Sequence, residues 1–262
     1  MKRMTRNVHV VGALVSALAV GACGDSTGLD GLDDTLVLDM ALVAADATLE
    51  DVTMWTQPLG VGPLLAEGPD GPAMVGRPGG HGDFTGEFSG TRAVTFYDEA
   101  GVAQTGFDPL LTESIHFIRE IEGEITRDNF SASISRTRDM TVSGLLGAET
   151  HRTWNGSGSE EMSRSGVMED GTPRSHESSG SFEFEDIVVP IPGSATRYPV
   201  SGTIRRSMTA TRTTADGTVT REVEVVITFD GTSIAQAVVN GDPVEIDLST
   251  REGRNPLRPS PR

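Results

Sequence analysis

Apolar residues recur at every second position over most of the chain beyond Thr91, and this alternation restricts the fold more than any other feature. The segment 130–143 shows the pattern best, with apolar residues at Phe130, Ala132, Ile134, Met140 and Val142. A period of two puts alternate side chains on opposite faces of a β-strand, so one face is apolar and the other small and hydroxylated. We therefore predict a mainly β fold: a twisted antiparallel meander sheet, which can curl like a half-barrel, with one N-terminal helix.

Two earlier segments have the same period. Residues 92–97 and 113–121 read as strands, and residues 98–101 (Asp-Glu-Ala-Gly) as a turn between them. Arg136 and Arg138 interrupt the apolar face of the segment 130–143. We expect that strand either to bend at the two arginines or to leave the core there.

The last third of the chain predicts a four-stranded meander with defined pairs. Two-residue loops at Asp216-Gly217 and Asp230-Gly231 are typical hairpin turns. The first loop puts Ala210 opposite Val223, Met208 opposite Val225, Ile204 opposite Phe229, Thr211 opposite Glu222 and Thr209 opposite Glu224. The second puts Ile227 opposite Ile234 and Val223 opposite Val238. Both loops then leave the apolar residues on one face.

The third turn needs three residues if the same face is to stay apolar. A two-residue loop at Asn240-Gly241 would put Val244 and Ile246 on the polar face, so we predict the loop Asn240-Gly241-Asp242. That loop sets Val238 opposite Val244 and Ile234 opposite Leu248.

Segment 155–181 is polar, with eight serines and five glycines. Residues 169–172 (Glu-Asp-Gly-Thr) favour a long polar hairpin, and disorder is the alternative. Residues 182–192 are apolar again and are expected to rejoin the sheet.

A helix is predicted before the sheet, over residues 35–55. Leu38, Leu42, Ala45, Leu49 and Val52 have helical spacing, and residues 33–35 (Asp-Asp-Thr) supply N-terminal capping groups. A strand over residues 36–43 is the alternative. Residues 58–90 hold ten glycines and five prolines, so we expect a long irregular loop there.

The N-terminus has the features of a secretory signal. Lys2, Arg3 and Arg6 precede an almost wholly apolar run over residues 10–20, with no acid before Asp25. That run is shorter than the roughly 20 apolar residues that span a bilayer. The sequence therefore predicts a cleaved signal over residues 1–22 rather than a membrane-spanning anchor.

The end of this run resembles the lipobox of bacterial lipoproteins, in the residues Val20, Gly21, Ala22 and Cys23. The resemblance covers about the first 23 residues, and Val20 replaces the commoner leucine. It implies that the Cys23 sulfur carries a diacylglyceryl group, that cleavage occurs before Cys23, and that the new amine is acylated. Gly24 follows in the place where aspartate favours the inner membrane, which implies the outer membrane, facing the periplasm or the cell surface. Residues 23–34 would form a flexible acidic tether.

Composition excludes several kinds of chemistry. Loss of residues 1–22 removes three positive charges and no acid, so the net charge moves from −17 to −20. A chain this acidic is not expected to bind nucleic acid, or anionic lipid other than through its own anchor. Lys2 is the only lysine and Cys23 the only cysteine, so lysine and thiol catalysis, disulfides and cysteine metal sites are excluded from the mature chain.

No catalytic, cofactor or metal residue is predicted. Ser26 sits in a G-x-S-x-G match, but in a linker without the strand and helix that this motif requires. The histidines lack metal-binding spacing; they are His9, His81, His116, His151 and His176. Ser114 and His116 share one face of a strand without an identifiable orienting acid. The Asp-Gly-Thr triplets at Asp170, Asp216 and Asp230 read as turns rather than calcium loops.

The sequence thus predicts a single domain over residues 35–250, with strands over 91–250 and an unstructured Arg/Pro-rich tail over 251–262. The expected function is a non-enzymatic binding or structural module in the bacterial envelope. It would be anchored to the membrane by its lipid and bind an unknown envelope protein. A carrier of a lipid or other hydrophobic ligand is one alternative, and a hydrolase without a familiar motif is the other.

Overall fold

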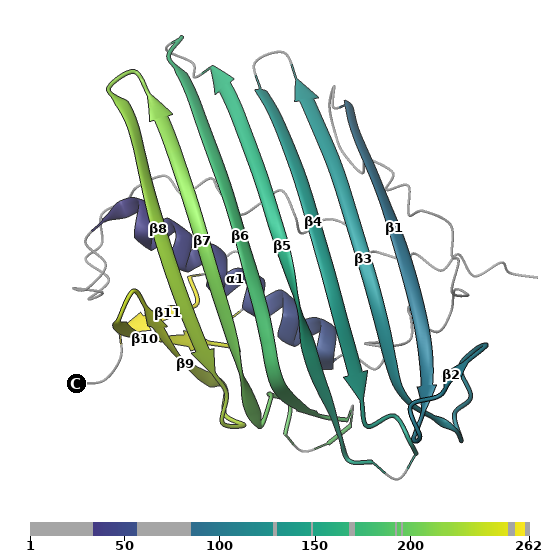
Figure 1. The fold of residues 1–262 in the computed structure, drawn as a ribbon. Helices are drawn as coiled ribbons and strands as arrows, with labels where there is room; N and C mark the ends of the chain where they lie inside the picture. Colours follow the sequence, from purple (N-terminus) through teal and green to yellow (C-terminus); the bar gives the residue numbers. More distant parts are fainter. Residues whose placement is uncertain are drawn as a thin grey trace, which may run out of the picture.

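The computed structural model describes residues 34–56, 85–127, 130–147, 149–167, 171–191, 193–194, 196–250 and 255–259. These residues form one helix and an 11-stranded antiparallel sheet that does not close into a barrel (Figure 1). The elements are α1 (Thr35–Thr56), β1 (Thr85–Asp98), β2 (Ala103–Gln104), β3 (Thr112–Arg127), β4 (Phe130–Ser143), β5 (His151–Val167), β6 (Pro173–Pro190), β7 (Ser201–Thr214), β8 (Gly217–Thr228), β9 (Ile234–Val239), β10 (Asp242–Asp247) and β11 (Leu257–Pro259). The prediction of a mainly β meander with one N-terminal helix is confirmed.

The strands follow one another across the sheet almost in chain order. The order is β2-β1-β3-β4-β5-β6-β7-β8-β9-β10-β11, with β2 at the edge beside β1. In Figure 1 α1 lies across one side of the sheet, which we call the inner face; the opposite side is the outer face. Alternate residues of each strand therefore point toward α1 or away from it.

Helix α1 forms where it was predicted, and the alternative strand over residues 36–43 is wrong. The carboxylate of Asp34 accepts hydrogen bonds from the backbone N–H groups of Leu36 (2.8 Å) and Val37 (3.4 Å), and so caps the first turn. The side of the helix that packs on the sheet includes Ala45 and Val52 of the predicted stripe but not its three leucines. It consists of Leu36, Met40, Ala41, Ala44, Ala45, Thr48, Asp51, Val52 and Trp55. Leu38, Leu42 and Leu49 pack only at its margin.

An aromatic cluster joins the end of α1 to the sheet. The ring of Trp55 lies edge-on to Phe184 at 5.2 Å between centroids and 6.3 Å from Trp154. Phe229 and Phe117 extend the cluster to either side. Aromatic rings bury large areas and favour such edge contacts, so this cluster fixes the helix on the inner face.

Strand β1 corrects the predicted loop over residues 58–90, because it begins at Thr85 and pairs with β3 along its length. Residues 57–84 lie outside the described part of the chain. The glycines of segment 85–90 misled the prediction, since they suggested turns. A Cβ atom on Gly90 would lie 2.7 Å from the carbonyl oxygen of Glu120, so Gly90 serves close strand pairing. The predicted strands 92–97 and 113–121 exist and are longer than expected.

The polar hairpin is ordered in its described residues, so the disorder alternative is wrong there. Strands β5 and β6 pair from His151↔Pro190 to Val167↔Pro173. The predicted turn lies partly outside the described residues, which resume at Gly171. Gly158 shows why the segment is glycine-rich: an added Cβ would lie 2.4 Å from the ring of Phe182. The glycine makes room for an aromatic ring.

The predicted meander of β7 to β10 exists, but its three loops differ from those predicted. The first loop is Ala215-Asp216, which sets Met208 opposite Val223 and Ile204 opposite Ile227. This moves each predicted partner by two residues, so the buried face is unchanged. On the outer face Thr209 lies opposite Glu222 and Thr211 opposite Thr220.

The errors at the next two loops compensate each other. Residues 229–233 connect β8 to β9, and Ile227 pairs with Ala237 rather than Ile234. The buried side chains of β9 are therefore Ala235, Ala237 and Val239, while Val238 is exposed. The third turn is the two-residue Asn240-Gly241, with φ of 49° and 95°. Val244 and Ile246 are buried opposite Ala237 and Ala235, so the predicted three-residue loop is wrong.

The C-terminal segment is also more structured than predicted. Residues 257–259 form β11 on the outer edge of β10, and Leu257 is buried in the core. A guanidinium nitrogen of Arg258 lies 3.5 Å from a carboxylate oxygen of Asp247. The basic tail is therefore attached to the acidic domain at this point.

Candidate functional site

One carboxylate is buried between α1 and the sheet. Asp51, 1% exposed, lies on the packed side of α1. Its Oδ1 atom is 3.0 Å from Nη2 of Arg138 on β4, and its Oδ2 accepts a hydrogen bond of 2.6 Å from Nη2 of Arg206 on β7. Burying a charge is costly unless it is paired, so this ion triad depends on all three side chains.

Phe182 separates the two arginines of the triad. Arg138, Gly158, Phe182 and Arg206 occupy one cross-strand row on β4 to β7. Both guanidinium groups lie over the Phe182 ring, at 5.6 Å for Arg138 and 5.3 Å for Arg206. A ring face attracts cations, so Phe182 helps to hold both arginines in place.

Further arginines extend the row toward the edge of the sheet. Arg92 on β1 pairs with Arg119 on β3, and Arg119 pairs with Arg138 on β4. Arg136, two residues from Arg138, lies on the same face, where its Nε donates a hydrogen bond of 2.6 Å to Glu160. We call Arg92, Arg119, Arg136 and Arg138 the arginine cluster.

Sequence analysis singled out Arg136 and Arg138 but did not predict their ion pairs. Strand β4 has no register shift at the two arginines and stays in the sheet, since its pairing with β3 and β5 runs unbroken past both residues. Arg138 and Arg136 are instead neutralised on the inner face by Asp51 and Glu160. A sequence signal for the ion triad was nonetheless present. Asp51 lies at helical spacing from Thr48 and Trp55, on the buried side of α1.

The outer face carries hydroxyls and carboxylates rather than a core. Its end row runs across six strands as Thr126, Ser131, Ser165, Ser175, Thr213 and Thr218. Hydroxyl pairs bridge neighbouring strands, including Ser131 with Ser165 at 2.7 Å and Ser133 with Ser163 at 2.8 Å. Acidic residues lie between them at Glu120, Glu122, Glu124, Glu161, Glu177, Glu222 and Glu224.

His116 has an acidic partner that the sequence did not reveal. Its Nε2 lies 2.6 Å from Oδ1 of Asp139 on the neighbouring strand of the outer face. Ser114 is on the same strand, but its cross-strand partners are Ser143 and Tyr97. Within the described residues the side-chain hydrogen bond of His116 goes to the Asp139 carboxylate and not to a hydroxyl.

Two other histidines lie apart from His116. His151 bonds to the hydroxyl of Thr150 at the start of β5. His176 faces α1 on the inner face, where burial, together with Arg164 and Arg212, lowers its pKa against the opposing effect of Asp39. Among the described residues no group of three or more His, Cys, Asp or Glu could hold a metal ion. Asp230 accepts hydrogen bonds from the backbone and hydroxyl of Thr232, which is the expected turn chemistry.

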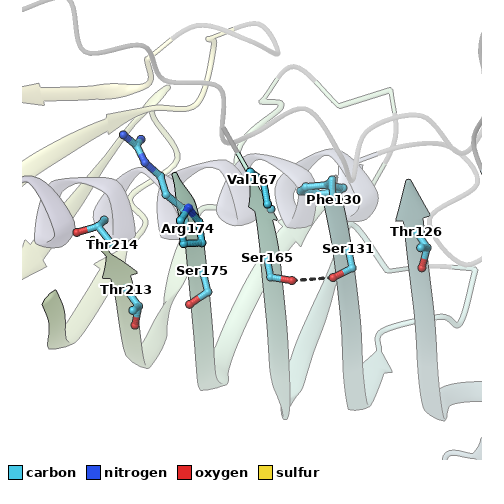
Figure 2. A pocket seen from close by; sticks show the side chains of 11 residues that line it. Thr126, Phe130, Ser131, Ser165, Val167, Arg174, Ser175, Thr213 and Thr214 are labelled. Atoms are coloured by element: carbon cyan, nitrogen blue, oxygen red, sulfur yellow. Dashed lines mark hydrogen bonds between the residues drawn. The ribbon is translucent and has the colours of Figure 1, made fainter. Parts of the chain in front are cut away.

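An open depression of about 480 Å³ lies at the hairpin ends of β3 to β7 (Figure 2). Five residues of the outer-face end row line it: Thr126, Ser131, Ser165, Ser175 and Thr213. The other lining residues are Phe130, Gly166, Val167, Pro173, Arg174 and Thr214. It is a shallow surface of mixed polarity at the strand ends.

The predicted lipidation residues Val20, Gly21, Ala22 and Cys23 lie outside the described part of the chain, as do Ser26, His9 and His81. In the part that is described, α1 is not apolar enough to cross a membrane. Comparison with protein-family models, with curated proteins and with solved structures gave no match. Function is therefore argued from the chain's own residues.

Proposed function

We propose that this protein is a lipid-anchored component of the bacterial envelope and acts as a non-enzymatic binding or structural module. Its anchor would be the acylated Cys23, because Val20, Gly21, Ala22 and Cys23 resemble a lipobox after a basic and then apolar segment. The membrane affinity would come from the acyl chains, each buried methylene contributing about 0.8 kcal/mol.

The observation that supports the binding role is that the two faces of the sheet differ: one is packed against α1 and the other is polar. Helix α1 and the aromatic cluster occupy the inner face, with Ala44, Ala45 and Trp55 at most 1% exposed. The outer face presents rows of hydroxyls and carboxylates on long strands. Such a surface offers many hydrogen-bond groups and no apolar core of its own, so it suits contact with a polar partner in the envelope.

The anchor is tested by replacing Cys23 with serine. We expect the wild-type protein to partition with membranes and to carry acyl mass at its N-terminus, and Cys23→Ser to lose both. Wild-type protein without acyl mass would refute the anchor.

The binding role is tested by placing a photo-crosslinking residue at Ser159, at the centre of the outer face, and at Glu99 in the turn after β1 as a control. A discrete adduct from envelopes is expected at Ser159 and not at Glu99. Equal labelling from both positions, or none from Ser159, would contradict a role for the outer face.

The carrier alternative has less support, because α1 packs directly on the inner face where a ligand would have to lie. Trp55 and Trp154 are buried there and would report ligand entry by fluorescence. Saturable quenching by a fatty-acid probe would favour the carrier over the binding module. The hydrolase alternative rests on the His116–Asp139 pair alone, in which His116 has no hydrogen bond to a hydroxyl within the described residues.

A further inference from the structure

The arginine cluster places like charges in directly opposed positions. Arg92, Arg119 and Arg138 form consecutive cross-strand pairs on β1, β3 and β4. Like charges directly opposite each other on one face of a sheet are destabilising. Three in a row, on a chain whose net charge is −17, therefore require compensation.

Compensation is uneven across the cluster. Arg138 pairs with Asp51, and Arg136 pairs with Glu160. For Arg119, in contrast, the described residues provide no carboxylate within ion-pair or hydrogen-bond distance. Its charged neighbours are cations, and burial together with Arg138, Arg136 and Arg92 lowers its pKa. Arg119 is half-buried, so water replaces the missing partner only in part.

The chemistry of this position fits one class of ligand. A guanidinium group presents a planar fork of N–H donors that matches the oxygens of a phosphate, and neighbouring guanidinium groups add charge. Among the nearby carboxylates, Asp51 accepts a hydrogen bond from Arg206 and lies at ion-pair distance from Arg138, and Glu160 accepts a hydrogen bond from Arg136. Glu50 on α1 lies within electrostatic range of Arg136 and Arg138. An additional anion would therefore meet Arg119 first.

We infer that Arg119, with Arg136 and Arg138 beside it, forms a binding site for a phosphate-type oxyanion on the inner face of β3 and β4. This site goes beyond the proposed function, because neither the lipid anchor nor the outer face takes part in it. The oxyanion could be a free phosphate or phosphate ester, or the headgroup of an anionic phospholipid.

The first test measures inorganic phosphate binding to the full chain by calorimetry, with potassium chloride at equal ionic strength as the blank. Wild-type protein is expected to bind phosphate, and Arg119→Gln to bind it at least about 10-fold more weakly, the loss of a strong charged contact. Arg205→Gln is the matched control, since Arg205 is an exposed arginine on the outer face paired with Glu185. It should bind phosphate as the wild type does.

A second variant separates binding from folding. Arg119→Lys keeps the charge and removes the planar fork, so we expect an intermediate affinity from a protein that unfolds cooperatively. Without phosphate and at low salt, Arg119→Gln should be no less stable than the wild type, because it removes an uncompensated cation.

A third experiment distinguishes a phospholipid headgroup from a soluble phosphate as the source of the oxyanion. In a Cys23→Ser background, vesicles containing phosphatidylglycerol are compared with vesicles of phosphatidylcholine alone. Binding to the anionic vesicles that depends on Arg119 identifies a headgroup site, and phosphate binding without it identifies a soluble ligand. If wild-type protein binds neither probe, or if Arg119→Gln and Arg119→Lys bind both as the wild type does, the inference is wrong.

Discussion

The Oδ2 atom of Asp51 in the helix lies 2.6 Å from Nη2 of Arg206 in the seventh strand, and both residues are at most 9% exposed. Their pairing, completed by Arg138, ties α1 to strands on both sides of Phe182. Because desolvating the three charged groups offsets their mutual attraction, the ion triad positions the helix more than it adds net stability.

Removing the Asp51 carboxylate alone should nevertheless lower the free energy of unfolding strongly. Asp51→Asn removes the carboxylate that pairs with both Arg138 and Arg206, and we expect a loss of about 3–5 kcal/mol in the free energy of unfolding. Urea denaturation measures it. Glu185→Gln removes the partner of exposed Arg205 and should cost no more than about 1 kcal/mol. Similar losses for the two variants would mean that Asp51 is not effectively buried.

Gly158 should tolerate no side chain. A Cβ at this position would lie 2.2 Å from the carbonyl oxygen of Thr137 and 2.4 Å from the Phe182 ring. Gly158→Ala should thus destabilise the protein by about 1–3 kcal/mol through overpacking. Gly106→Ala, where nothing lies within 4 Å, is the control in the same thermal unfolding series. Equal midpoints for the two alanine variants would be inconsistent with the packing described.

The stability of the protein should depend on pH through His176. Because burial and Arg164 lower its pKa below the ordinary value of about 6.5, the unfolded chain binds its proton more readily than the folded protein does. Above the pKa that His176 has in the unfolded chain, the ring is neutral in both states and does not affect stability. As the pH drops from that value through the pKa of His176 in the folded protein, the free energy of unfolding falls. In His176→Gln this part of the pH dependence should disappear. Titration of the His176 ring by NMR checks the cause: a pKa at or above 6.5 would exclude it.

Asn240 should matter both for its turn and for the edge of β8. Its Oδ1 accepts a hydrogen bond of 2.8 Å from the Glu224 N–H, and its Nδ2 donates one of 3.2 Å to the Glu222 carbonyl. Asn240→Gly keeps the left-handed backbone and loses both bonds, so we expect a loss of about 1–3 kcal/mol. Asn240→Asp keeps the acceptor and should lose less. If the two variants are equally stable in urea, the side-chain bonds contribute little.

The sequence predicted the class of fold because period two is a local signal, and it failed where two local signals had equal weight. Both faces of β9 carry apolar residues: Ile234 and Val238, on either side of Gln236, on one, and Ala235, Ala237 and Val239 on the other. Because Ile234 and Val238 are the larger pair, sequence analysis predicted that their face of β9 would be buried. The five-residue connection, held by the turn of Asp230 with Thr232, puts the smaller ones inside.

The candidate site was harder to foresee because it depends on tertiary pairing. Arg138 was visible as a charge on an apolar face, and Asp51 as an acid among buried helix positions. Only the crossing of α1 over β4 and β7 brings them together, and no spacing rule encodes that crossing. Arg119 was less visible still, since its neighbours Arg92 and Arg138 come from strands 27 and 19 residues away along the chain.

The paired hydroxyls of the outer face have a consequence for whatever meets them. In Ser131–Ser165, Ser133–Ser163 and Thr211–Thr220, either oxygen can donate the proton and the other accept it. Each pair can therefore reverse its polarity by rotating two hydrogens, while every heavier atom stays in place. The surface is thus rigid in shape and adjustable in its pattern of donors and acceptors.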